Sequence, residues 1–114
     1  MAKTKAVRPP IDSRNVTRYI LLMIQSFRHR GLRRFFETGS PAGIPAAHAR
    51  RIAAMLVQLN EADQPSDLNM PGWKLHPLKG EKAGRWAVSV NANMRLTFAF
   101  DGKNAVDIDL EDYH

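Results

Sequence analysis

Hydrophobic side chains recur at two spacings along the chain, a helical one in the first half and strict alternation in the second half. The helical spacing predicts one helix over residues 28–38 and a second that begins near Pro45, a residue that a first helical turn tolerates. Gly39 and Pro41 end the first helix, and we expect the two helices to pack as a hairpin. The expected apolar positions are Leu32, Phe35 and Phe36 in the first helix and Ala49, Ile52, Ala53, Leu56 and Leu59 in the second, with Arg50, Arg51 and Gln58 facing outward.

The alternating spacing predicts a run of short strands at residues 73–78, 85–90 and 94–100, followed by a terminal strand from Val106. Their connections are short, and Asp101-Gly102 is a strong hairpin signal. An earlier strand is expected at residues 23–27. Helices followed by hairpin-linked strands form the α+β pattern. We therefore predict an N-terminal strand and a helical hairpin packed on one face of a mainly antiparallel sheet of four to five strands.

Side-chain parity separates the two faces of this sheet. The face toward the helices is expected to carry Trp73, Leu75, Trp86, Val88, Val90, Leu96, Phe98, Phe100, Val106 and Ile108. The open face is expected to carry Lys74, His76, Arg85, Ser89, Arg95, Thr97, Asp107 and Asp109. An open, mostly basic sheet face with one His is a candidate RNA surface.

The composition fits one globular domain. The 114 residues are 44% hydrophobic and 25% charged, and they include no cysteine, which excludes disulfides and thiolate metal sites. No apolar run approaches the roughly 18 residues of a membrane span, so we expect no membrane partner and a cytoplasmic protein.

Charge is unevenly distributed over the chain. The net charge is +6, which suits a polyanion such as RNA or DNA, but residues 101–114 hold five Asp or Glu and one Lys. Residues 1–22 hold five Lys or Arg and one Asp and show no clear period. We interpret residues 1–22 as a basic, flexible extension, upstream of the natural start at Met23, and residues 23–114 as the single domain. A nucleic-acid-binding arm is the alternative.

Residues whose side chains can transfer protons or bind phosphate lie at the ends of the predicted strands. His76 lies at the end of a predicted strand, and Lys79 is the first residue of a basic, glycine-containing loop that also holds Lys82. His76 could transfer a proton while Lys79 binds phosphate. A surface His at a strand end is the plainer interpretation. Arg95 should project from the open face, where its planar fork could grip phosphate or pair with Asp107 or Asp109.

The chain ends in a carboxylate, a phenol and an imidazole, at Asp112, Tyr113 and His114. Metal-independent RNA cleavage needs activation of the 2′-hydroxyl, charge stabilisation and protonation of the leaving oxygen, and these groups with His76 and Arg95 could supply them. A metal site from His76, Asp112 and His114 has no supporting spacing, so we expect no cofactor. His29 and His48 are expected to be ordinary solvent-facing residues.

Several motifs in fixed order closely resemble the HigB toxins of the RelE/ParE superfamily. They are IQSFRHRG from Ile24, LNMPGWKLHPLKG from Leu68, WAVSVN from Trp86, MRLTF from Met94 and the ending DLEDYH from Asp109. The resemblance implies a RelE-like fold and a ribosome-dependent mRNA interferase that cuts codons in the ribosomal A site. His76, Lys79, Arg95, Asp112, Tyr113 and His114 match functional positions of the family motifs, and Lys74, Lys82 and Arg85 are expected to bind phosphate.

The resemblance also implies partners. They are a HigA-type helix-turn-helix antitoxin, the 70S ribosome with its mRNA, and operator DNA reached only through the antitoxin. Two alternatives remain open at the level of sequence: a ParE-like inhibitor of DNA gyrase, and a non-catalytic co-repressor that acts with its antitoxin.

Overall fold

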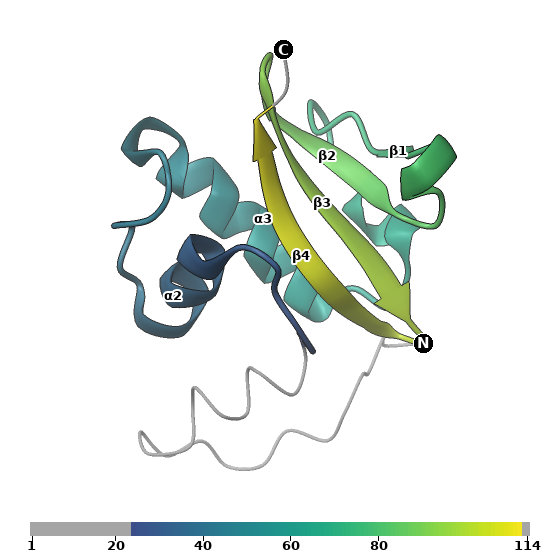
Figure 1. Cartoon of the computed structure of the whole chain (residues 1–114), viewed down its shortest axis with the longest axis horizontal. Coiled ribbons are helices and arrows are strands. Elements are labelled where there is room, and N and C mark those ends of the chain that lie inside the picture. The colour runs from purple at the N-terminus through teal and green to yellow at the C-terminus, as the bar shows by residue number, and fades with distance from the viewer. Residues whose placement is uncertain (1–23, 113–114) are drawn as a thin grey trace.

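A sheet with two helices on one of its faces makes up the fold in a computed structural model that describes residues 24–112 (Figure 1). Within those residues the sheet has four strands in the order β1-β2-β3-β4, and every neighbouring pair is antiparallel. The strands are β1 (His76–Pro77), β2 (Trp86–Asn91), β3 (Met94–Asp101) and β4 (Asn104–Asp112), and the α-helices are α2 (Arg30–Thr38) and α3 (Ala49–Glu61). The predicted α+β class is confirmed.

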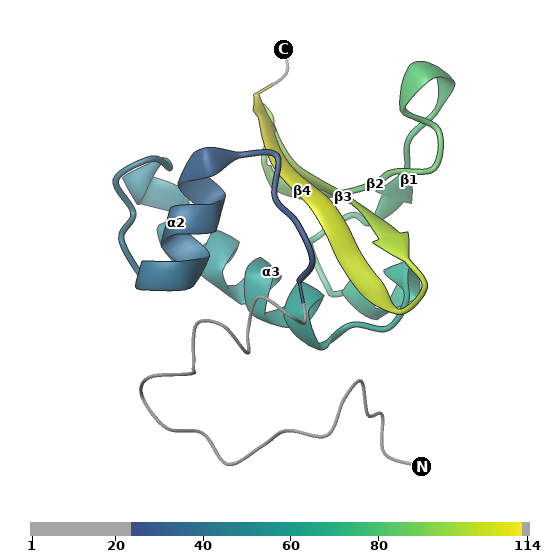
Figure 2. The ribbon, with the colours of Figure 1, turned by 60° about the horizontal axis from the view of Figure 1, so that its bottom comes forward.

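The segment before α2 runs beside β4 (Figure 2). The Gln25 amide donates to the Ala105 carbonyl at 3.0 Å, the Arg28 amide donates to the Ile108 carbonyl at 2.8 Å, and Phe27 forms an isolated parallel bridge with Ile108. This segment therefore adds parallel contacts at the sheet edge, in place of the regular strand predicted at residues 23–27. Met23 lies outside the described residues.

Side chains that looked solvent-facing in the sequence define the helix ends and fix the helices to the sheet. The His29 Nδ1 accepts the Leu32 amide proton at 3.0 Å, so His29 caps α2, which begins at Arg30 and not at residue 28. Arg51 donates to the carbonyls of Ser89 and Gly72, at 2.9 and 2.8 Å. Gln58 donates to the Asp67 carbonyl at 3.1 Å. The prediction that these side chains face solvent was wrong, because each hydrogen-bonds a backbone group, which lies three positions away for His29, nine for Gln58, and 21 and 38 for Arg51.

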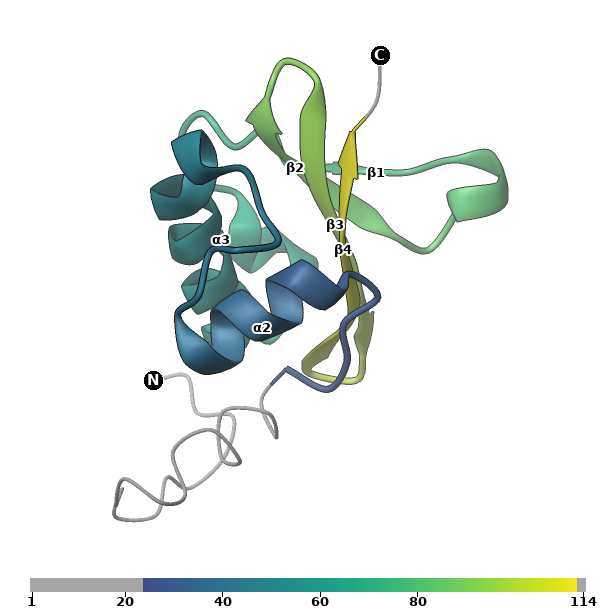
Figure 3. The ribbon, with the colours of Figure 1, turned by 60° about the vertical axis from the view of Figure 1, so that its left-hand side comes forward.

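Both helices cover the same face of the sheet (Figure 3). A 3₁₀ turn (Ala46–His48) leads into α3, close to the predicted start at Pro45. The connection from α2 returns so closely past Gly31 that a Cβ built there would lie 2.4 Å from the Gly43 carbonyl oxygen. Only glycine permits this approach of two backbones.

The core fills the space between these helices and the sheet. Its fully buried side chains include Leu32, Ile52, Leu59, Leu96 and Phe98, as the helical and alternating patterns predicted. Among the described residues, no helix has the length and hydrophobicity that crossing a bilayer requires.

The predicted inward position of Val106 was wrong. Ala105 and Ile108 are both fully buried, whereas Val106 is absent from the core cluster. The pairing of β3 with β4 shifts between Thr97 and Ala99, and Asp107 has a φ of 53°. This bulge inserts one residue into β4 and reverses the alternation on either side of it.

The first predicted strand of the second half is also much shorter than expected. Residues 73–78 were predicted to form a strand, but β1 consists of His76 and Pro77 alone. Lys74 has a φ of 54°, in the left-handed region that interrupts a strand. The Trp73 carbonyl still accepts from the Ser89 amide at 2.7 Å, so the segment stays beside β2.

Candidate active site on the open sheet face

The strand register places the candidate residues in two neighbouring rows on the face opposite the helices. Ser89, Arg95 and Glu111 pair across β2, β3 and β4 and form one row. His76, Ala87, Thr97 and Asp109 pair across all four described strands and form the next row. From ordinary strand spacings, the Cα atoms of His76 and Arg95 lie on the order of 12 Å apart, which two long side chains can bridge through one phosphate.

His76 has a defined tautomer. Its Nδ1 lies 2.8 Å from the Lys74 carbonyl oxygen, and a carbonyl can only accept, so Nδ1 carries a proton and donates it. In the neutral ring the Nε2 lone pair is then available as a base. The left-handed backbone of Lys74 lies within this arrangement, as strained residues often do at functional sites.

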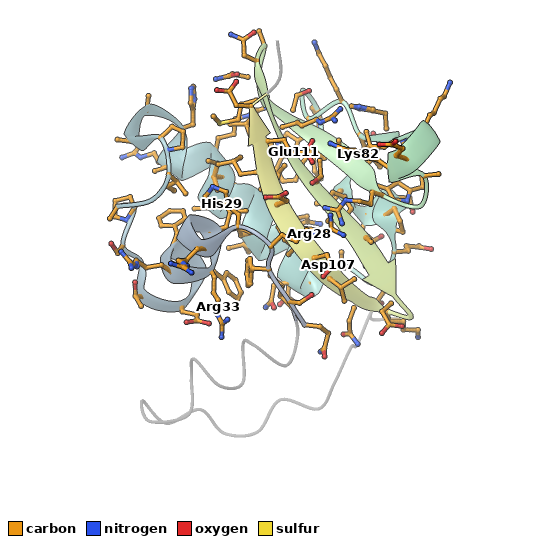
Figure 4. All side chains as sticks on the ribbon, in the orientation of Figure 1. Arg28, His29, Arg33, Lys82, Asp107 and Glu111 are labelled. Carbon is orange, nitrogen blue, oxygen red and sulfur yellow. The ribbon has the colours of Figure 1, made fainter. Side chains whose placement is uncertain are left out.

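Glu111 pairs with Arg95 and with Lys82, and Figure 4 shows Glu111 and Lys82 near one another. Its Oε1 accepts from Arg95 Nε at 3.0 Å and lies 3.0 Å from Arg95 Nη2, and Lys82 Nζ donates to both of its oxygens at 3.0 Å. Burial alone would raise the pKa of Glu111, but the hydrogen bonds and charges of Lys82 and Arg95 lower it below the ordinary value. The predicted pairing of Arg95 with Asp107 or Asp109 is replaced by this pairing with Glu111.

Arg85 lies on this side of the sheet but is only 7% exposed. Its Nη2 donates to Thr97 Oγ1 and to the Asp107 carbonyl, both at 2.8 Å, while Nε and Nη1 are buried without a hydrogen-bond partner. Burial lowers the pKa of Arg85 and the Arg28 charge lowers it further, against the carboxylates of Asp107, Asp109 and Glu111. The exposed phosphate contact predicted for Arg85 does not match this buried position.

The Asp107 bulge is held from both sides. Ser26 Oγ donates to Asp107 Oδ1 at 3.0 Å and accepts from the Asp107 amide at 2.7 Å. Arg28 Nη2 lies 3.9 Å from Asp107 Oδ2 (Figure 4). Together with Arg85, these contacts fix the strand that carries Glu111 and Asp112.

The other predicted site residues are either exposed or outside the described part of the chain. Lys74, Lys79, Lys82 and Asp112 are exposed, and Asp112 pairs with Met94 at the same end of the sheet as Arg95. Tyr113 and His114 lie outside the described residues. Among residues 24–112, no group of three His, Asp or Glu side chains is arranged to hold a metal ion.

Two sets of contacts were not expected from the sequence: those of Glu111 on the open face and, outside the two rows, that of His48. Glu111 was placed in the terminal strand but given no role, although its alternation with Asp109 put it on the open face. His48 was read as solvent-facing, yet its Nε2 lies 2.8 Å from Asn91 Nδ2. No local signal marks that contact, because the two residues are 43 positions apart.

Comparison with known proteins places this geometry in a family. Residues 25–114 match the model of HigB-like toxins, described as RelE-like toxins of the type II toxin–antitoxin system HigB. The chain belongs to the HigB-like toxin family. The endoribonuclease HigB of Proteus vulgaris is 44% identical over 92 residues, which cover 81% of this chain and the whole of that relative. The HigB-like match includes both rows of the open face and continues through Asp112 to His114.

Proposed function

We propose that this HigB-like chain is an endoribonuclease toxin that cleaves mRNA on the ribosome. The observation that carries the proposal is its 44% identity to an endoribonuclease over that protein's entire length. The open face supports it, because His76 offers a base and Arg95, Lys79 and Lys82 offer positive charge around it. The basic net charge of +6 suits an RNA substrate.

The proposed reaction uses protein side chains alone. His76 Nε2 takes the proton of a ribose 2′-hydroxyl, and the resulting oxygen bonds to the adjacent phosphorus. The bond from phosphorus to the 5′-oxygen breaks, which leaves a 2′,3′-cyclic phosphate and a 5′-hydroxyl. His114 donates the proton to the leaving oxygen, Asp112 and Tyr113 orient that imidazole, and Tyr113 can also stack on a base.

Arg95 and Lys82 stabilise the negative charge that develops on the phosphate. In the protein alone both cations are engaged by Glu111, so the phosphate competes with that carboxylate for them. Lys79 begins the loop that carries Lys82 and adds a further exposed cation. Because Arg85 is buried, its proposed part is to hold β4 in place and not to touch phosphate directly.

The proposed partners follow from the family and the substrate. A type II antitoxin, of the HigA helix-turn-helix kind, would inhibit the toxin and connect it to operator DNA. The ribosome would present the mRNA codon in its A site. Residues 24–112 bury a hydrophobic core of their own.

Cleavage mapping separates this function from its alternatives. Residues 23–114 are incubated with an mRNA, with and without translating ribosomes, and 5′ ends are mapped by primer extension. The expected result is new ends within codons only when ribosomes are present. Supercoiling inhibition without cleavage would instead indicate a gyrase inhibitor, and neither effect would indicate a co-repressor.

A further inference from the structure

The backbone of Lys74 is strained, and its carbonyl is the group that fixes the tautomer of His76. Lys74 has a φ of 54°, and its carbonyl oxygen lies 2.8 Å from His76 Nδ1. A residue with a Cβ adopts this left-handed conformation at an energetic cost. Such a conformation persists only where the surrounding contacts hold the chain. The contacts that hold the backbone at Lys74 therefore also decide where the hydrogen-bond acceptor of His76 lies.

The two residues before Lys74 are held by hydrogen bonds to their carbonyls. The Gly72 carbonyl accepts from Arg51 Nη2 at 2.8 Å. The Trp73 carbonyl accepts from the Ser89 amide at 2.7 Å. Arg51 also holds Ser89 itself, because Nη2 and Nε donate to the Ser89 carbonyl at 2.9 and 3.2 Å. One guanidinium of α3 thus ties the segment before β1 to β2.

Arg51 makes these contacts through the shape of its side chain. Its planar fork places Nε and Nη2 so that both donate to one carbonyl while Nη2 also reaches a second one. The single side-chain nitrogen of lysine ends one bond short of the Nη2 position of arginine. Within residues 24–112, Arg51 forms no ion pair with a carboxylate. The fold therefore uses the geometry of Arg51 and not only its positive charge.

We propose that Arg51 is a positioning residue for His76, on which it acts through the backbone of Lys74. The guanidinium holds the chain before Lys74 against β2, so that the Lys74 carbonyl stays in place to accept the Nδ1 proton. The inference rests on the proposed function and deepens it, because a residue of α3, outside both rows of the open face, then prepares the base. Without Arg51 the neutral ring can also carry its proton on Nε2. A ring in that state has no lone pair on Nε2 and cannot accept the 2′-hydroxyl proton there.

The tautomer of His76 is the direct readout, and ¹⁵N NMR of histidine-labelled protein measures it at about pH 9, where an imidazole is neutral. The signals of His76 are those that His76→Ala lacks. Wild type should show the proton on Nδ1. Arg51→Met should carry the proton on Nε2 in about half of the molecules or more, and Arg51→Lys should do the same, since lysine cannot reproduce the fork.

Gln58→Met is the matched control, because Gln58 also ties α3 to a backbone carbonyl beyond the helix, that of Asp67 at 3.1 Å. The loss of this hydrogen bond should lower the midpoint of urea unfolding and leave the tautomer of His76 as in wild type. Arg51→Lys is the milder change and decides the test if Arg51→Met does not fold. A wild-type tautomer in the folded Arg51 variants, or the same change of tautomer in Gln58→Met, would overturn the positioning role.

Single-turnover cleavage on translating ribosomes separates positioning from RNA binding. Arg51→Lys should lower the maximal rate about threefold or more and leave the half-saturating protein concentration within about twofold, because a misplaced base slows the chemical step. A wild-type rate for Arg51→Lys would show instead that Arg51 acts as a cation on the RNA, and it would overturn the proposal. An altered tautomer in the Arg51 variants without cleavage by wild type would refute the proposed function alone. An unaltered tautomer in those variants beside cleavage by wild type would refute the positioning alone.

Discussion

Glu111 is the residue on which the electrostatics of the open face depend. It holds Arg95 and Lys82 at 3.0 Å, and its side chain is only 18% exposed. A carboxylate in this position orients two cations in the absence of RNA. It also sets the charge that an incoming phosphate must displace.

Replacing Glu111 by Gln should lower the free energy of unfolding by about 1–3 kcal/mol at pH 7, since hydrogen bonds to charged groups are lost. The lowered pKa of Glu111 makes this contribution pH-dependent. As the pH falls, Glu111 is protonated in the unfolded state before it is protonated in the folded state. The stabilisation by Glu111 is therefore fully present above about pH 4.3, the ordinary pKa of Glu, and is lost as the pH falls through the lower pKa of the folded state. Urea unfolding of both proteins at pH 7 and pH 3 measures the difference.

The control is Glu37→Gln, which breaks the pair of Glu37 with Arg33, a side chain 61% exposed to solvent. That pair should contribute only about 0.5 kcal/mol at pH 7. A loss for Glu111→Gln that is equally small, or that does not shrink toward pH 3, would contradict the role assigned to Glu111.

Arg85 offers a second test at the residue scale. Arg85→Ala removes both 2.8 Å hydrogen bonds and leaves a cavity, so it should cost about 2–4 kcal/mol of unfolding free energy. Arg85→Met keeps most of the volume and should cost less, with mRNA cleavage within about threefold of wild type. Calorimetry and a cleavage assay measure the two effects. If Arg85→Met folds well but loses cleavage as completely as Arg95→Ala, then Arg85 contacts phosphate after all.

At the scale of elements, the bulge in β4 determines which side chains reach the open face. Asp107 has a φ of 53° and is held by Ser26. Asp107→Asn keeps a side chain that tolerates this conformation and should change the unfolding free energy by less than about 1 kcal/mol. Asp107→Val, with a β-branched side chain, should cost about 2–3 kcal/mol. Thermal unfolding that shows Val tolerated as well as Asn would contradict the strained bulge.

The bulge also shows where the sequence pattern stops being informative. Strict alternation predicted Ile108 on the inner face, and Ile108 packs there. The same alternation failed at Val106, which precedes the inserted residue in β4. The contacts that hold the bulge come from Ser26 and Arg85, 81 and 22 positions away, and no local pattern reports them.

The candidate site was likewise predictable only where it depends on the local alternation of side chains along a strand. Parity alone placed His76 and Arg95 on one face, because alternation is a local property of strands. The partner of Arg95 and the burial of Arg85 were not predictable, because each depends on tertiary contacts. The cap by His29 is a local contact, with the Leu32 amide three positions on, and was missed all the same. Short β1 is another such case, since the left-handed Lys74 has no glycine or asparagine to signal it.

At the scale of the whole molecule, mRNA cleavage should tolerate a deletion at the N-terminus but not an extension at the C-terminus. Ile24, the first described residue, is already fully buried in the core. Removing residues 1–22 should therefore leave the melting temperature within about 2 °C and leave mRNA cleavage intact. A tag added after His114 should reduce cleavage at least tenfold, because the proposed chemistry extends to that residue. Full cleavage by the tagged protein would argue against a role for the terminal residues.

An endoribonuclease site on the open sheet face with His76 as its base should lose its activity when that imidazole is removed. The most direct test is the single-turnover rate of mRNA cleavage on translating ribosomes by wild type and by His76→Ala, with His48→Ala as a control outside the catalytic row. We expect a loss of at least 100-fold for His76→Ala at an unchanged fold, in line with a lost general base, and a loss below tenfold for His48→Ala. A His76→Ala rate within threefold of wild type would contradict it.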